Sequence, residues 1–303
     1  MIDTRLTRKF GLTCPIVLAP MSHTAGGRLA AAVSAAGGLG LIGDGGGDLE
    51  WIEAQFDEAA DEVVGCGLTT WRLSRMPEAL DHILNRRPKA IYLSYGDPRP
   101  FASKIRQEGI PLFCQIHSLE EAQQAVEAEA DIIVAQGCAA GSHSSERSTM
   151  TLVPEVADYL YKASHDTLLL AAGGITDSRG LAASIVMGAD GVVMGTRLWA
   201  SQQMLLSPSD VDIAVNATGD DTRRITTSDQ SKDTEWPEHY GLRVLTDDFV
   251  GRWMKKHDPT SLSPPVGEAI GLVHDTPPVG EIIKTISTKA ERLLTHVQRK
   301  VIH

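Results

Sequence analysis

Eight short apolar segments alternate with longer segments of helical periodicity along residues 15–198, and this alternation predicts an α/β fold. The apolar segments are nearly continuous runs rich in Val, Ile and Leu, which is typical of parallel strands buried on both faces. Eight such units within about 200 residues match the number and size of a compact TIM (β/α)8 barrel. A doubly wound open sheet is the alternative, and both folds bind ligands at the carboxyl ends of their strands.

The expected strands follow one another at regular intervals. They lie within residues 15–21, 39–45, 62–71, 90–96, 111–117, 131–137, 167–175 and 190–198. Helices are expected between them, and two carry clear terminal signals. Residues 118–129 begin with Ser118 followed by Glu121, as in a capping box. Residues 177–187 begin with Asp177 and end before Gly188, a typical helix stop.

The pattern changes after the eighth expected strand, which divides the chain into three parts. Residues 1–206 are expected to form the barrel. Residues 207–279 are polar, contain several prolines and lack strand–helix alternation, so we expect an inserted, mostly helical or irregular segment that covers the substrate. Residues 280–303 read as an amphipathic C-terminal helix that packs back on the barrel.

Composition argues for a small-molecule partner. The net charge is −11 and Lys and Arg form no run, which argues against a nucleic-acid or anionic membrane partner. No segment has the roughly 18 consecutive apolar residues of a membrane span, and the N-terminus lacks a signal-peptide pattern, so a cytoplasmic protein is expected. The four cysteines are far apart, which favours reduced thiols over disulfides or a zinc site. The sequence leaves open whether the protein forms a homo-oligomer.

Two glycine-containing turns follow the seventh and eighth expected strands, where barrels commonly bind phosphate. Gly173 and Gly174 end the seventh strand, and Gly195 with Thr196 opens the turn after the eighth. Such turns let backbone N–H groups approach an anion closely. Neither a GxGxxG nor a GxxxxGK motif is present in the required place, so a phosphorylated cofactor such as FMN fits better than a dinucleotide.

His143 is the leading candidate for catalysis. It ends the segment "AQGCAAGSH", which follows the sixth expected strand. A neutral imidazole can act as a general base near neutral pH, and a protonated one can bind an anion. His23 and His117 also follow strands and stay open as second acid–base groups, whereas Trp236, with His239 and Tyr240, is a candidate for a substrate-covering loop.

Several motifs in order resemble the nitronate monooxygenase family, formerly called 2-nitropropane dioxygenases. They are "PIVLAPM", "LAAAVSAAGGLGLIG", "AQGCAAGSH" with "RSTMTLVPEV", "LLLAAGGI" and "GADGVVMGTRL". The segments "VGCGLTTW" and "PKAIYLSYGDP" look most like fungal-type and related bacterial members. The resemblance extends from about residue 10 to residue 200. It implies an FMN-binding barrel that oxidises alkyl nitronates, and by extension nitroalkanes, with O2 to a carbonyl compound and nitrite.

The resemblance also assigns residues to roles. His143 falls on the family's catalytic histidine, and with His23 it is expected to bind the substrate. The residues implied in cofactor binding are Ala19, Pro20, Met21, Gly67, Gln115, Gln136, Gly141, Ser142, Gly173, Gly174, Met194, Gly195 and Thr196.

Four positions depart from the family pattern. Ala139 stands where the family has Glu, and Ser142 where it has Gly. Gly67 and Gln115 stand where some members carry Asn and Lys, and a neutral Gln stabilises an anionic reduced flavin less than Lys would. Two alternatives therefore stay open: an NAD(P)H-dependent enoyl reductase-like enzyme on the same scaffold, and a non-catalytic FMN-binding or scaffold protein.

Overall fold

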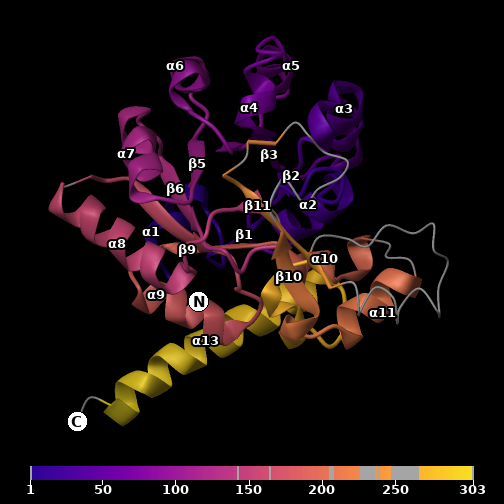
Figure 1. Cartoon of the computed structure of the whole chain (residues 1–303), viewed down its shortest axis with the longest axis vertical. Coiled ribbons are helices and arrows are strands. Elements are labelled where there is room, and N and C mark those ends of the chain that lie inside the picture. Colours follow the sequence, from indigo (N-terminus) through magenta and orange to yellow (C-terminus); the bar gives the residue numbers. More distant parts are fainter. Residues whose placement is uncertain are drawn as a thin grey trace.

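The computed structural model describes residues 2–141, 143–163, 165–204, 208–225, 236–237, 239–246 and 266–301. Eight parallel strands run around a central axis (Figure 1). They are β1 (Ile16–Leu18), β2 (Leu41–Ile42), β3 (Gly65–Thr69), β4 (Ile91–Ser94), β5 (Leu112–Ile116), β6 (Ile132–Gln136), β8 (Leu168–Ala172) and β9 (Gly191–Met194). Each lies within one of the eight predicted segments.

The strands pair in the order β1-β9-β8-β6-β5-β4-β3-β2. A parallel bridge between Val17 and Leu39, just before β2, joins the two ends of this order and closes the ring. The predicted TIM barrel is therefore confirmed, and the open-sheet alternative is excluded.

Helices cover the outside of the barrel, as the alternating pattern predicts. They are α1 (Arg5–Phe10), α2 (Gly27–Ala35), α3 (Leu49–Glu58), α4 (Thr70–Leu73), α5 (Ala79–Asn85), α6 (Arg99–Gln107), α7 (Leu119–Glu127), α8 (Thr149–Lys162), α9 (Ser178–Val186) and α10 (Thr196–Trp199), with short 3-10 turns at Gly45–Gly47 and Gln202–Met204. The predicted caps are present: the Ser118 hydroxyl accepts from the Glu121 N–H, and the Asp177 carboxylate caps α9.

The amino-terminal end of the barrel is closed by packing. Leu6 and Phe10 of α1 are buried against the inward-facing Tyr92 and Phe113, and the Phe10 and Phe113 rings lie 5.6 Å apart between centroids. Because this end is filled with apolar side chains, a ligand has access from the carboxyl ends of the strands.

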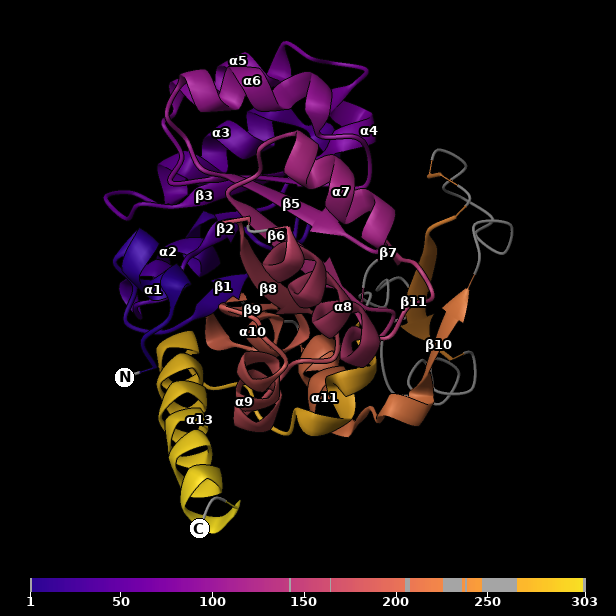
Figure 2. The ribbon, with the colours of Figure 1, turned by 90° about the vertical axis from the view of Figure 1, so that its left-hand side faces the viewer.

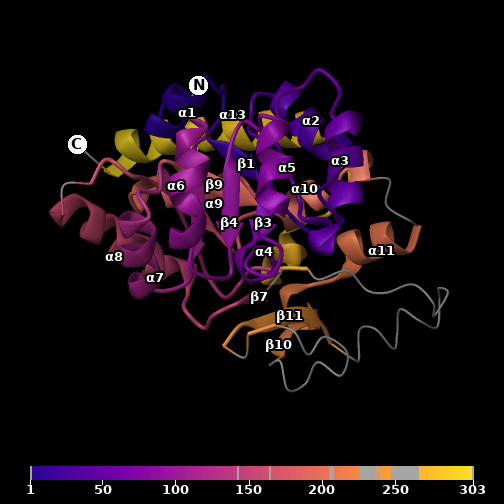
Figure 3. The same ribbon diagram turned by 90° about the horizontal axis from the view of Figure 1, so that it is seen from above.

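The cap segment, residues 207–279, contains more regular structure than its sequence suggests. Its described elements are α11 (Pro208–Asn216), a 3-10 turn at Gly219–Asp221, β10 (Thr222–Ile225), β11 (Gly241–Leu245) and a 3-10 helix at Glu268–Leu272. Strand β11 pairs antiparallel with β10 and with β7 (His143–Ser144), the short strand after β6. Figure 3 shows these three strands together at one side of the barrel. The sequence did not predict this small sheet.

The C-terminal helix α13 (Val279–Val301) packs along the barrel and extends beyond it (Figure 2). Its buried face consists of Ile282, Ile283, Ile286 and Ala290, and it contacts α9 and α2. Within the described part of the chain, no helix is both long and apolar enough to cross a membrane.

Candidate functional site

A cavity of about 350 Å³ lies at the carboxyl ends of the barrel strands, under the cap segment. Most of the expected cofactor residues line it: Ala19, Pro20, Met21, Gly67, Gln115, Gln136, Gly141, Gly173, Gly174, Gly195 and Thr196. His143 lines the same cavity. The fold thus brings together residues from strands that are far apart in sequence.

Two predicted residues do not contribute to this lining. Met194 is fully buried in β9, where its carbonyl accepts from the Ala19 N–H at 2.9 Å. Ser142 lies outside the described residues.

One end of the cavity is suited to an anion. Gly173 and Gly174 have φ angles of 90° and 78°, and a Cβ on Gly173 would lie 2.6 Å from the Gly137 carbonyl oxygen. The adjacent Thr176 hydroxyl is buried and has no hydrogen-bond partner among the described residues. An unsatisfied buried hydroxyl beside a tight glycine turn is a donor set for a phosphate group.

The part of the cavity wall beside Pro20 and Met21 is apolar and closely packed. A Cβ on Gly67 would lie 2.2 Å from the Cβ of Pro20, so glycine is required where β3 meets the segment after β1. Gly195 similarly faces the Met21 sulfur. Such a smooth apolar wall is suited to a flat ring system.

The backbone of His143 is held by two buried donors. The Gln136 side-chain amide donates to the His143 carbonyl at 2.9 Å, and the Tyr95 hydroxyl donates to the same oxygen at 3.0 Å. His143 also pairs with Leu242 of β11. Its side chain is only 7% exposed, so the barrel and the cap fix this residue together.

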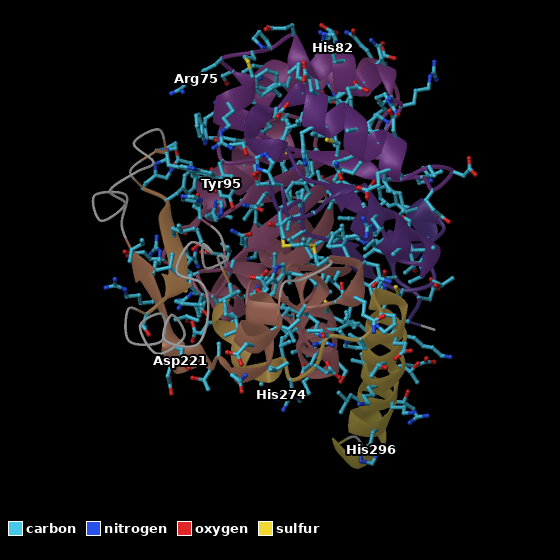
Figure 4. The ribbon with its side chains drawn as sticks, turned by 90° about the vertical axis from the view of Figure 1, so that its right-hand side faces the viewer. Arg75, His82, Tyr95, Asp221, His274 and His296 are labelled. Atoms are coloured by element: carbon cyan, nitrogen blue, oxygen red, sulfur yellow. The ribbon has the colours of Figure 1, made fainter. Side chains whose placement is uncertain are left out.

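The imidazole of His143 lies flat against an aromatic ring from the cap segment. The centroids of the His143 and Trp236 rings are 3.5 Å apart, with an interplanar angle of 9°. Trp236 in turn contacts Tyr95 and Trp71 edge to face. Trp236 thus packs against the candidate base from the cap segment. Figure 4 shows Tyr95 on the side of the barrel that faces the cap strands.

The other two candidate histidines do not line the cavity. His23 is exposed, and its ring lies 5.2 Å from that of Trp51. His117 is 1% exposed and lies behind the cavity, between Tyr95 and Tyr240. Among the described histidines, His143 is therefore the one that lines the cavity.

Sequence reasoning missed a charged pair in the lining. The Asp44 carboxylate is buried and lies 3.6 Å from the Arg72 guanidinium, at the end of the cavity formed by β2 and β3. Tyr95 was also missed. Asp44 and Tyr95 lie near the carboxyl ends of the predicted segments 39–45 and 90–96, so their positions were the available signal. Arg72 follows β3 by one helical turn.

Two cysteines are buried in the strands that surround the cavity. Burial raises the pKa of the Cys66 and Cys114 thiols well above the ordinary value. These thiols are therefore protonated packing groups and not nucleophiles.

The fold and this cavity define an enzyme built on a TIM barrel. A family model for nitronate monooxygenase matches residues 50–234. The chain is also 31% identical over 336 residues to the nitronate monooxygenase npaC of Metarhizium robertsii, covering 93% of this chain and 92% of that protein. The chain therefore belongs to the nitronate monooxygenase family, and a flavin cofactor is implied by that membership.

Solved structures resemble this one over nearly its whole length. FabK from Thermotoga maritima has a TM-score of 0.83 and 25% identity, covering 99% of this chain and 100% of that chain. A nitroalkane oxidase from Streptomyces ansochromogenes has a TM-score of 0.77 and 18% identity, covering 94% and 98%. The second likeness shows the shared fold.

Proposed function

We propose that the protein is an FMN-dependent enzyme that oxidises alkyl nitronates, and nitroalkanes after deprotonation, with O2 to a carbonyl compound and nitrite. The observation that carries the proposal is the position of His143, which lines the cavity and is covered by Trp236. Membership of the nitronate monooxygenase family supports the reaction class.

The residues present fit FMN. The Gly173–Gly174 turn and the buried Thr176 hydroxyl would hold the phosphate, and the apolar wall at Pro20 and Gly67 would contact the ring. When bound, FMN would supply the acceptor for electrons from the nitronate, and O2 would take up those electrons and provide the oxygen atom of the carbonyl product.

Residues of the chain itself accept the substrate proton and exclude water from the site. His143 accepts the proton from the carbon beside the nitro group when the substrate is a neutral nitroalkane. Gln136 and Tyr95 hold its backbone, while Trp236 keeps its ring buried. Exclusion of water strengthens electrostatic interactions at the site. A preformed nitronate has already lost this proton, so its oxidation needs His143 only as an anion-binding group.

Substitution of His143 tests this assignment. We expect His143→Ala to lower kcat/KM for a neutral nitroalkane by about 10²- to 10⁴-fold, the usual range for a general base, and to affect preformed nitronate much less. His82→Ala, an exposed histidine on α5, is the matched control. His23→Ala tests the expected substrate contact, because an effect on KM would bring this exposed residue into the site. Unchanged nitroalkane turnover in His143→Ala would refute the base assignment.

Anaerobic spectra separate this proposal from the two alternatives. We expect an alkyl nitronate to bleach the flavin absorbance, and NADPH to leave it unchanged. Rapid bleaching by NADPH alone would favour an enoyl reductase-like reaction instead. A colourless protein that takes up no FMN would favour the non-catalytic alternative, which membership of an enzyme family already disfavours.

A further inference from the structure

A buried network behind the cavity is centred on His117, which directly follows β5. The His117 Nδ1 atom lies 3.2 Å from the Glu121 Oε2 atom, and the His117 backbone N–H donates to the same oxygen. The Tyr240 hydroxyl donates to the other carboxylate oxygen of Glu121 at 3.2 Å. The Glu121 carboxylate therefore accepts hydrogen bonds from His117 of the barrel and from Tyr240 of the cap.

This contact sets the tautomer of His117. Burial opposes ionisation of Glu121, but the hydrogen bonds and electrostatic attraction of His117, together with a hydrogen bond from Tyr240, outweigh burial and lower the pKa of the carboxyl group. An ionised carboxylate has no proton to donate. The Gln136 amide nitrogen, which donates to the His143 carbonyl, also lies 3.3 Å from the His117 Nε2 atom. This Nε2 must therefore be an acceptor, and the ring proton must lie on Nδ1, beside the Glu121 carboxylate.

Two side-chain amides meet this acceptor. The Nε2 atoms of Gln115 and Gln136 each lie 3.3 Å from the His117 Nε2 atom. An independent contact requires the orientation of the Gln136 amide, because its nitrogen also donates to the His143 carbonyl, which can only accept. The Gln115 oxygen accepts from the Tyr92 hydroxyl at 2.7 Å.

The network determines which polar atom of the Gln136 side chain is available to a ligand in the cavity. Both N–H groups of the Gln136 amide are engaged, by His117 and by the His143 carbonyl. Its side-chain oxygen is therefore the group that remains for a ligand, and Gln136 lines the cavity. An amide free to rotate would present either an oxygen or an N–H group there.

We propose that His117 and Glu121 are positioning residues that lock the Gln136 amide with its oxygen toward the cavity, where it accepts from a ring N–H of the bound flavin. The fixed orientation of the Gln136 amide also supports His143, because the same amide donates a hydrogen bond to the His143 carbonyl. The flavin half of this inference rests on the proposed function, whereas the tautomer of His117 does not.

The tautomer can be measured in the protein without flavin. Nitrogen-15 spectra of the histidine-labelled protein at neutral pH are expected to show His117 protonated at Nδ1 and unprotonated at Nε2, assigned by the signals absent from His117→Phe. Glu121→Leu should abolish the exclusive Nδ1–H form. Glu120→Leu, an exposed neighbour on the same helical turn, should preserve it. A wild-type His117 protonated at Nε2 would overturn the proposal.

Flavin binding tests whether the orientation of the Gln136 amide contributes to the affinity for FMN. His117→Phe keeps a ring beside Tyr95 but removes the acceptor, so we expect the Kd for FMN to rise about fivefold, the effect of one net hydrogen bond, with a shifted absorbance spectrum. His117→Gln retains an acceptor and should restore both properties. Wild-type Kd and spectrum in a folded His117→Phe would refute the positioning role. If the wild type itself binds no FMN, the flavin assignment fails, while the tautomer measurement still decides whether the lock exists.

Discussion

The stack of Trp236 on His143 makes a quantitative prediction. The His143 backbone is fixed by two hydrogen bonds to its carbonyl, and its imidazole stacks on the ring of Trp236, 3.5 Å away between centroids, with Tyr95 edge to face at 6.2 Å. Aromatic pairs contribute roughly 0.5–1.5 kcal/mol beyond their burial. Since about 1.4 kcal/mol corresponds to a tenfold change in rate, Trp236→Leu should lower kcat/KM for a neutral nitroalkane between about twofold and tenfold.

The assay compares two substrates and two tryptophans. Initial rates of nitrite release are measured with a neutral nitroalkane and with its preformed nitronate, at fixed O2. The loss should be larger for the nitroalkane, because only that substrate needs the base. Trp71→Leu is the matched control, since Trp71 touches Trp236 edge to face at 5.6 Å and does not line the cavity. Unchanged nitroalkane turnover in Trp236→Leu, or an equal loss in both variants, would refute the reasoning.

Three further substitutions test the anion end, the cap and the buried network. Gly173→Ala should abolish measurable FMN binding in a titration, because its Cβ would lie 2.6 Å from a carbonyl oxygen, and Gly174→Ala, which meets only a methyl group at 3.1 Å, should weaken it less. Arg243→Ala should lower the unfolding free energy by about 1.5–3 kcal/mol in urea, because Arg243 donates twice to the Cys138 carbonyl. Glu121→Gln should be less stable than the wild type at pH 7. Because the folded pKa of Glu121 is lowered, this difference should be complete above about pH 4.3 and shrink as the pH falls through the folded pKa. A difference independent of pH would contradict this account.

The barrel was predictable because its signals are local. Each strand is an apolar run bounded by a turn, and caps such as Ser118 and Asp177 act within three residues of their own position. The small sheet of the cap carries no such signal. Strand β7 has two residues within a glycine-rich segment, and its partner β11 lies about 100 residues further along the chain. Pairing of this kind depends on tertiary contacts that no local pattern records.

The site illustrates the same limit. The position of a residue after a strand predicted that Gly173 and Gly195 would meet in one cavity, the family resemblance added Gln136, and all three line the cavity. The same rule did not distinguish the histidines. His117 follows β5 directly and is buried behind the cavity, whereas His143 comes seven residues after Gln136 and is brought back over the cavity by pairing with β11. For His143, pairing with strand β11 of the cap determines that the residue faces the cavity.

The cap also contacts the segment around Ala139, the position at which the family resemblance leads us to expect a glutamate. The Ala139 carbonyl accepts from the Glu268 N–H at 3.0 Å, so the segment after β6 is in direct contact with the cap. Arg243 joins the Cys138 carbonyl to the Glu268 carboxylate, which lies 3.1 Å from its guanidinium. The Glu268 carboxylate therefore contacts the segment after β6 through Arg243. This ion pair and the backbone hydrogen bond from Glu268 join the segment that carries His143 to the cap, so the conformation of this segment depends on the cap.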